Sequence, residues 1–245
     1  MRKESKKMFS KEIIEQARAI AAQIHVPEKF GCDQNCEFDS YDLHDQLTRL
    51  NMGSFHIENG ITKAVIIFDS LPYVIKIPFN GMWEYDYDYD EENDEYIECD
   101  ANFIYFNHAR ALDTSDYCWN ELDKIVKAYD YGYGCFFPET AVVYENNGWR
   151  FYIQEKVRPA CERNFTPTTS KDSRDKAANL AIGYRICSED WRAAAIENYG
   201  ESILISFVDW NDVGALGYLD DMHSGNYGYR FDGTPVLFDV SGFRD

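Results

Sequence analysis

Two stretches of helical periodicity open the chain. The first follows Ser10, a residue type that caps helices, and its apolar positions repeat every three or four residues until Pro27 ends it. The second is shorter and begins near residue 40. The apolar positions concerned are Ile13, Ala17, Ile20, Ala21, Ile24, Leu43, Leu47 and Leu50. We expect residues 1–50 to form a helical extension that covers an exposed face of the domain, with residues 29–37 as a loop between its helices.

From Gly53 onward the period of the pattern changes from that of helices to that of β-strands. Short turns separate the strands, and the first of them is Asn59-Gly60, a sequence that favours a tight hairpin. The predicted strands are residues 54–58, 63–68, 73–77, 136–144 and 149–157. Together they predict a five-stranded antiparallel sheet.

One helix is predicted between the third and the fourth of these strands. It starts near Tyr117 and ends at Gly132, with Glu121 at the edge of its apolar stripe. The stripe consists of Trp119, Leu122, Ile125, Val126 and Tyr129. Two helical segments at 172–187 and 188–216 follow the sheet, so the sequence predicts an α+β fold.

Residues 80–117 interrupt the strand pattern. Within them, residues 84–95 are densely acidic and partly alternate aspartate with tyrosine, and like charges so close together oppose compaction. We interpret residues 80–117 as a solvated, partly mobile insertion outside the core. The alternative is a docking surface for a basic partner, to which the tyrosines would add contact area.

Composition narrows the class of protein. The chain has 245 residues, of which 45% are hydrophobic and 16% aromatic, enough to fill the core of one domain or one bilobed unit. It contains no run of about eighteen apolar residues and no apolar stretch directly behind its basic N-terminus, so we expect a cytoplasmic protein with no membrane association. Its seven cysteines are odd in number and scattered, which favours reduced thiols over disulfides or a zinc site.

The net charge of −19 restricts the partners. A surface this acidic repels the phosphate backbone of nucleic acids, so direct binding to nucleic acid is not expected. ATP is also a polyanion, and binding it requires local basic groups and Mg²⁺. The same surface attracts basic proteins, or imitates DNA toward a DNA-binding enzyme.

The last quarter of the chain carries the candidate chemistry. Residues 227–230 and 235–238 are predicted to form a hairpin around a tight turn. Asp221 and Asn226 precede its first strand, and Asp239 follows its second strand. Three oxygen-bearing side chains are therefore expected at one end of the hairpin. Two carboxylates and an amide suit Mg²⁺, which keeps several waters and takes its remaining ligands from phosphate.

The spacing of these residues also matches a known family. Asp221 precedes Asn226 by five residues, and Asn226 precedes Asp239 by thirteen. This resembles the catalytic loop and metal-binding segment of the protein-kinase-like fold, and the loop sequence Asp-Met-His-Ser-Gly-Asn is similar to that of the short early serine/threonine kinases of lytic bacteriophages. The resemblance implies a bilobed kinase-like fold with Asp221 as catalytic base and with Asn226 and Asp239 as Mg²⁺ ligands. It gives His223 the place of a cation that contacts the transferred phosphoryl group.

The same resemblance assigns residues in the first part of the chain. Lys76 lies on the third strand among apolar residues, where an inward-pointing lysine without a partner would be costly, and the kinase-like fold uses such a lysine to hold the ATP phosphates. Glu121 is the candidate for the helical glutamate that pairs with it. Asn59-Gly60 is the turn over the phosphates, with one glycine in place of the family's three. Glu155 and Val157 occupy the hinge, whose backbone would bind adenine.

Three departures from the family's pattern bear on the substrate. Asp220 stands before the catalytic aspartate in place of arginine, so activation through a phosphorylated loop is not expected. The metal segment has one extra residue before Gly242. The chain also ends six residues after Asp239, so we expect no conventional activation segment or peptide platform. Peptide recognition must then be built otherwise, or the substrate is not a peptide.

The sequence therefore predicts an ATP- and Mg²⁺-dependent phosphotransferase, specifically a phage-type serine/threonine protein kinase that acts on host proteins. The expected organisation is a helical extension at 1–50, an N-lobe of five strands and one helix at 51–157, and a reduced, mainly helical C-lobe at 158–245. Two alternatives stay open. One is a catalytically silent or DNA-mimicking protein that binds and inhibits a host protein. The other is a small-molecule kinase, since Asp-x-His-x-Gly-Asn also resembles the loop of sugar and antibiotic kinases.

Overall fold

The chain has an α+β fold that separates into two compact units. Unit 1 comprises Met1–Trp119 and Ala141–Gln154, and unit 2 comprises Asn120–Thr140 and Glu155–Asp245. The computed structural model describes residues 9–26, 29–32, 41–59, 62–90, 93–106, 116–146, 149–161, 165–184, 186–216 and 224–240. No helix within these ranges is long and apolar enough to cross a membrane.

The five-stranded antiparallel sheet predicted from the sequence is confirmed. Its strands follow the order β2-β3-β4-β8-β7, so the last of them in the sequence lies inside the sheet, beside β4. The strands are β2 (Phe55–Asn59), β3 (Lys63–Phe68), β4 (Tyr73–Pro78), β7 (Thr140–Asn146) and β8 (Trp149–Glu155). Strand β7 begins four residues later than predicted, because Gly134–Phe136 forms a turn of 3-10 helix, η1.

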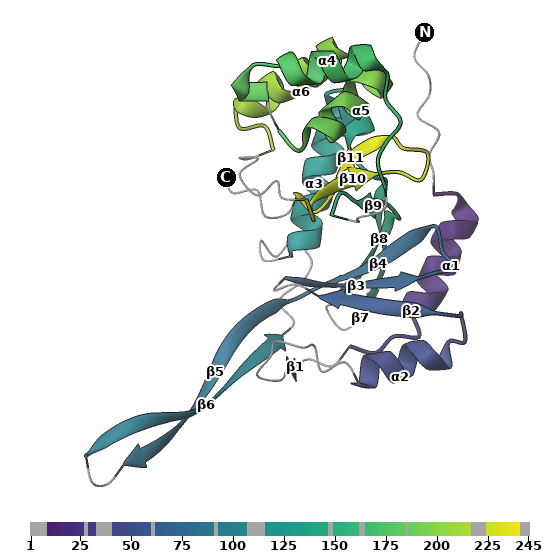
Figure 1. The fold of residues 1–245 in the computed structure, drawn as a ribbon. Helices are drawn as coiled ribbons and strands as arrows, with labels where there is room; N and C mark the ends of the chain where they lie inside the picture. The colour runs from purple at the N-terminus through teal and green to yellow at the C-terminus, as the bar shows by residue number, and fades with distance from the viewer. Residues whose placement is uncertain are drawn as a thin grey trace. The chain divides into compact units, whose positions relative to one another are not determined.

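Helices α1 (Lys11–Ala21) and α2 (Tyr41–Arg49) pack on one face of this sheet (Figure 1). Ser10 caps α1, because its side-chain oxygen accepts a hydrogen bond from the backbone N–H of Ile13 (3.3 Å). The core of unit 1 includes Ala17, Ile20, Leu47, Ile66, Ile75, Ile77, Trp149, Phe151 and Ile153. Each large aliphatic side chain buried here contributes about 1.5–3 kcal/mol. The side chains that alternate with these strand residues therefore lie on the opposite face.

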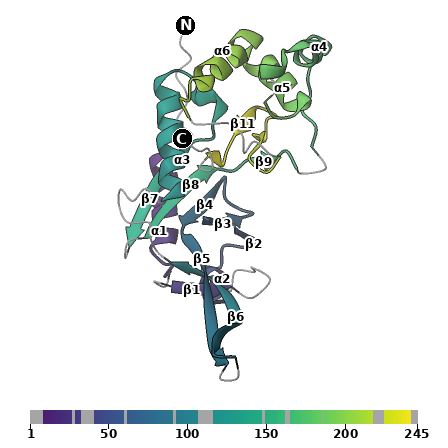
Figure 2. The ribbon, with the colours of Figure 1, turned by 90° about the vertical axis from the view of Figure 1, so that its left-hand side faces the viewer.

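Unit 1 also contains a three-stranded sheet that sequence reasoning missed. Strands β5 (Asn80–Asp90) and β6 (Glu95–Phe106) form a long antiparallel ribbon (Figure 2), and β1 (Lys29–Cys32) pairs with the other edge of β6. The prediction of a loop over residues 29–37 is therefore wrong for residues 29–32, which form β1. No strand was predicted in the acidic segment, yet the ribbon includes most of it, with one register shift in the pairing, between Asp86 and Tyr87. The interpretation of this segment as a solvated insertion stays a prediction.

Helix α3 (Tyr117–Asp130) starts where the sequence predicts, but its buried face differs. Its most buried positions are Cys118, Glu121, Ile125 and Ala128. Val126 and Tyr129, which were assigned to the apolar stripe, are 49% and 42% exposed. The spacing of the buried positions is still helical. Glu121 therefore lies in the middle of the buried face and not at its edge.

The predicted helices of unit 2 are shorter than expected. The elements of unit 2 after α3 and η1 are β9 (Arg158–Pro159), α4 (Lys171–Asn179), η2 (Ile182–Tyr184), α5 (Glu189–Tyr199), α6 (Glu201–Asp212), β10 (Tyr227–Tyr229) and β11 (Pro235–Leu237). The single helix predicted over 188–216 is wrong, because Gly200 divides it. The φ angle of Gly200 is +94°, and its N–H donates to the carbonyl of Ile196 (2.9 Å), which ends α5.

The predicted hairpin is present, and α5 holds it in place. Strands β9, β10 and β11 form one sheet in the order β11-β10-β9. The indole N–H of Trp191 donates to the carbonyl of Val236 (3.2 Å), and the hydroxyl of Tyr199 donates to the carbonyl of Pro235 (2.7 Å). The aromatic core of unit 2 contains Phe136, Phe137, Trp191 and Phe207. The hairpin is thus fixed through both its backbone and its packing.

Gly228 lets β9 and β10 approach closely. It lies in the middle of β10, opposite Pro159 of β9 and Val236 of β11. A Cβ atom at this position would lie 2.0 Å from the carbonyl oxygen of Arg158, which is backbone and cannot swing away. Only glycine fits between these strands without moving them.

Candidate functional site

The hairpin brings Asn226 and Asp239 together at its open end. Tyr227 is opposite Leu237 in the register, and the N–H of Phe238 donates to the carbonyl of Asn226 (2.9 Å). Asn226 therefore directly precedes Tyr227 of the last register pair. Asp239 comes two residues after Leu237, the other member of that pair. Asn226 is buried, at 5% exposure, and Asp239 is half-buried.

Helix α3 holds the backbone beyond this end. Asp239 has a φ angle of +57°, a left-handed conformation that costs most residues about 1–2 kcal/mol but that aspartate tolerates better than most. Its N–H donates to the carboxylate of Glu121 (3.1 Å), and the ammonium group of Lys124, three residues further along α3, donates to the carbonyl of Val240 (3.4 Å). We call Asn226, Asp239, Glu121 and Lys124 the hairpin end.

In the described structure, Glu121 therefore binds the backbone of Asp239. It is 1% exposed, and a buried carboxylate requires hydrogen-bond donors. The N–H of Asp239 is one such donor, and it fixes the position from which the Asp239 side chain leaves the backbone. Lys76 belongs to unit 1 and Glu121 to unit 2. Their pairing stays a prediction.

The hairpin end has oxygen ligands of the kind that Mg²⁺ prefers, an amide from Asn226 and a carboxylate from Asp239. Asp221 and His223, the other predicted residues of this site, lie outside the described residues. Over the described ranges, no group of three His, Cys, Asp or Glu side chains could hold a metal ion. A Mg²⁺ ion at the hairpin end would thus take two protein ligands from the described residues and the remainder from water and phosphate.

Lys76 lies on the polar face of the five-stranded sheet in unit 1. It is 4% exposed, and it alternates along β4 with Ile75 and Ile77, which belong to the apolar core. It is opposite Val65 in the register. We call the buried polar residues on this side the polar sheet face. They are Lys63, Lys76, Arg150, Tyr152 and Gln154, each at most 5% exposed.

Asp116 neutralises one cation of this face and caps α3. Its carboxylate accepts hydrogen bonds from the guanidinium of Arg150 (3.0 Å), the hydroxyl of Tyr152 (2.7 Å) and the N–H of Trp119 (2.9 Å). The Arg150 guanidinium also lies over the indole of Trp119, 4.8 Å from the ring centroid. Burial, and next the bond to Asp116, raise the pKa of Tyr152, which therefore remains a hydrogen-bond donor at neutral pH.

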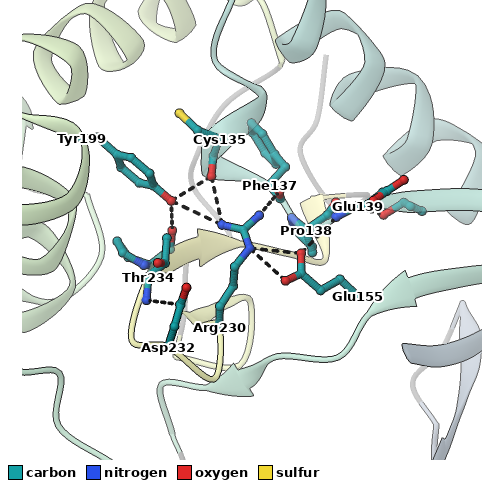
Figure 3. A network of polar contacts seen from close by, with 11 residues as sticks. Cys135, Phe137, Pro138, Glu139, Glu155, Tyr199, Arg230, Asp232 and Thr234 are labelled. Atoms are coloured by element: carbon teal, nitrogen blue, oxygen red, sulfur yellow. Dashed lines mark hydrogen bonds and ion pairs between the residues drawn. The ribbon is translucent and has the colours of Figure 1, made fainter. Parts of the chain in front are cut away.

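The predicted hinge is tied to the hairpin by Arg230 (Figure 3). The Arg230 Nε donates to both carboxylate oxygens of Glu155 (2.9 and 3.1 Å), and its two Nη atoms donate to the carbonyls of Cys135 (3.2 Å) and Phe137 (2.7 Å). Burial lowers the pKa of the guanidinium, but Glu155 together with Tyr199 and Tyr129 raises it more, so this pKa lies above its ordinary value. The cation is thus permanently charged and joins three separate segments of unit 2.

Of the residues predicted to bind the nucleotide, the structure describes Glu155, Val157 and the backbone of Asn59. The N–H of Glu155 donates to the carbonyl of Glu139 (2.8 Å), which restricts any adenine contact of Glu155 to its carbonyl group. Val157 is half-buried, two residues beyond. Asn59 is the last residue of β2, opposite Ala64 in the register. The side chain of Asn59 and the whole of Gly60 lie outside the described residues.

Replacing Arg230 by lysine is expected to lower the free energy of unfolding by about 1–3 kcal/mol. Lysine keeps the charge but presents a compact ammonium group, which cannot satisfy Glu155 and two carbonyls in three directions. Urea unfolding followed by tryptophan fluorescence measures this change. The exposed Arg174→Lys is the matched control and should stay within about 0.5 kcal/mol of the parent. Equal stability of the two variants would show that the Arg230 fork is unimportant.

Sequence reasoning missed two residues of these networks. Asp116 directly precedes a predicted helix, and aspartate is a good capping residue, so the sequence could have predicted its role as the cap of α3. The contacts of Arg230 could not have been predicted from the sequence, because Glu155 and Cys135 are 75 and 95 residues away in the chain.

Comparison of the chain with protein-family models, with curated proteins and with solved structures gave no match in any of the three. The comparisons therefore identify no family for this chain, and the resemblance to kinases stays a prediction from the sequence.

Proposed function

We propose that this protein is an ATP- and Mg²⁺-dependent phosphotransferase that phosphorylates serine or threonine hydroxyls of proteins. The observation that supports this best is the hairpin end. Asn226 and Asp239, thirteen residues apart, lie at one end of one hairpin, and the buried Glu121 binds the Asp239 backbone. The residues whose spacing resembles a catalytic loop thus bring two oxygen-bearing side chains to one end of the hairpin, where Glu121 binds the backbone of one of them, and this arrangement supports the proposal.

Each residue has one role in this proposal. Bound Mg²⁺ would neutralise charge on the phosphates. Asn226 and Asp239 hold it, and Glu121 keeps Asp239 in its left-handed conformation. Lys76 binds the phosphates, and Asp221 orients the acceptor hydroxyl and takes its proton. His223 donates a hydrogen bond to the transferred phosphoryl group.

The proposed substrate is a protein of the host of a lytic bacteriophage, by resemblance to the early kinases of such phages. The net charge of −19 favours a basic substrate protein, because opposite charges accelerate encounter. This proposal places the enzyme in the host cytoplasm.

The test is phosphoryl transfer from radiolabelled ATP by the purified full chain, with bacterial extract and a lysine-rich protein offered as acceptors. Label on the chain itself or on protein acceptors supports the proposal. Label on metabolites alone replaces it with a small-molecule kinase. Absence of transfer, together with stable capture of a bacterial protein, replaces it with a binding protein.

Removal of Mg²⁺ is expected to abolish transfer. With excess EDTA the label on acceptors should fall to background, because a triphosphate without its metal keeps its full charge in an already acidic protein. Adding Mg²⁺ beyond the chelator should restore the rate. Transfer that continues at an undiminished rate in EDTA would contradict the metal role of Asn226 and Asp239.

A further inference from the structure

The outer part of the ribbon formed by β5 and β6 has no third strand. Strand β1 pairs with β6 only over residues 103–106. From there outward, among the residues that the structure describes, β5 and β6 pair only with each other, up to Asp90 opposite Glu95 (Figure 2). A two-stranded ribbon by itself is marginally stable in water, so a partner that covers this part would stabilise it.

The charges of the ribbon oppose its pairing. The register places Asp86 opposite Asp100, and Asp90 opposite Glu95. Like charges directly opposite each other destabilise a pair of strands. Residues 84–100 include ten acidic residues and no lysine or arginine. Positive charge that relieves this repulsion must therefore come from outside the segment.

Two tyrosines at the end of the ribbon expose their rings. Tyr89 is opposite Tyr96 in the register, their ring centroids are 5.2 Å apart, and they are 49% and 73% exposed. The hydroxyl of Tyr89 donates to the carboxylate of Asp94, which is also exposed. We call Tyr89, Asp94 and Tyr96 the ribbon tip. Because the two rings already contact each other, a partner that packs on them restricts them little further, and tyrosine is enriched in protein interfaces.

The ribbon tip suits lysine and arginine side chains. An ammonium or guanidinium group binds over the face of a tyrosine ring, and the carboxylate of Asp94 adds a charge-assisted hydrogen bond beside it. Nucleic acid would be repelled by the acidic residues of the ribbon, and a second copy of the chain would bring the same negative charge. The partner that fits this surface is thus a basic segment of another protein.

We propose that the ribbon tip docks a basic segment of the substrate protein, away from the hydroxyl that receives the phosphoryl group. The inference rests on the proposed function in taking the bound protein as the substrate. It also narrows the docking surface considered for residues 80–117 to three side chains. Docking apart from the reacting atoms stabilises the bound substrate and the transition state equally, so its loss raises KM and leaves kcat unchanged.

The experiment measures binding of a labelled peptide of alternating arginine and serine to the full chain, by fluorescence anisotropy at physiological salt. Tyr96→Ser is expected to weaken binding by about 10-fold, as for an aromatic residue central to an interface. Tyr96→Phe keeps the ring and should stay within about 3-fold of the parent. Tyr131→Ser removes another exposed tyrosine, at 62% exposure, and should bind like the parent.

A second variant tests the charge of the ribbon tip. Asp94→Asn keeps an acceptor for the Tyr89 hydroxyl and tolerates the left-handed φ angle of +55°, so only the charge is lost. It should weaken binding by about 3-fold and make the affinity less sensitive to salt. Asp45→Asn, an exposed aspartate on α2, is the matched control and should bind like the parent.

Circular dichroism shows whether each variant is folded, and kinetics with the same peptide as acceptor should show a raised KM with kcat within about twofold of the parent. A parent that does not bind the peptide overturns the docking surface, as does equal affinity of the two tyrosine-to-serine variants. Phosphoryl transfer with parent-like affinity and KM in Tyr96→Ser refutes this inference alone. Binding that depends on Tyr96, in a chain that transfers nothing to any acceptor, supports the docking surface and refutes the proposed function.

Discussion

Replacing Asp239 by asparagine is expected to lower the rate of phosphoryl transfer by about 10²–10³-fold, the size of effect seen when one preorganised electrostatic group is removed from an active site. Asparagine has the same shape and also tolerates the left-handed conformation, with a φ angle of +57°, so the bond from its N–H to Glu121 should persist. What is lost is the negative charge on a Mg²⁺ ligand. Initial rates at several Mg²⁺ concentrations measure the loss, and the apparent Mg²⁺ affinity should fall with the rate.

The control is Asp232→Asn at the opposite end of the same hairpin. Asp232 lies in the turn, where its carboxylate accepts a hydrogen bond from the N–H of Thr234 (2.9 Å). Asparagine keeps that acceptor, so the variant makes the same change of charge without changing the turn. Its rate should stay within about twofold of the parent, because the turn is remote from the hairpin end. Equal losses in both variants would indicate a general effect of charge, and an active Asp239→Asn would remove the proposed metal ligand.

Asp116→Ala is expected to lower the free energy of unfolding by about 3–5 kcal/mol, a large part of the stability of an ordinary domain. The substitution leaves the guanidinium of Arg150 without its buried counter-charge and the hydroxyl of Tyr152 without its acceptor. It also removes the cap of α3, whose first N–H groups then lack a partner. Urea unfolding followed by circular dichroism measures the change.

A second substitution separates these causes. If the buried charge dominates, adding Arg150→Met to Asp116→Ala should recover part of the loss, because an apolar pair replaces a buried cation whose remaining carboxylate partner, Glu145 at 3.6 Å, is half exposed. Asp45→Ala on α2 removes an exposed aspartate from the same unit and should change stability by less than about 0.5 kcal/mol. A loss below about 1 kcal/mol for Asp116→Ala would show that this network contributes little.

The parts of the fold that were predictable are those fixed by neighbours in the sequence. Strand β2 alternates apolar and polar residues, β3 is a run of apolar residues after Lys63, and the hairpin at 227–238 is closed by a short turn, so local patterns determined these elements. The open end of that hairpin followed from its register, which is why the adjacency of Asn226 and Asp239 was foreseeable.

The parts that were missed depend on partners far along the chain. Lys29–Cys32 is a strand because β6, more than sixty residues later, offers it an edge. The acidic ribbon is regular because two charged strands pair with each other, and composition records the charge but not the pairing. The face of α3 that carries Glu121 was misjudged because its orientation is set by tertiary contacts, which outweigh a pattern of isolated apolar residues.

The absence of a side chain at Gly228 gives this chain a recognisable signature. Since any larger residue would collide with the Arg158 carbonyl, natural variation at this position should be negligible, while the flanking tyrosines are freer to change. The order Asn-x-Gly-x-Arg, with aspartate nine positions after the arginine, can then serve as a query for finding distant homologues. Chains that keep this order of residues at low overall sequence identity would share the hairpin and the contacts of its arginine.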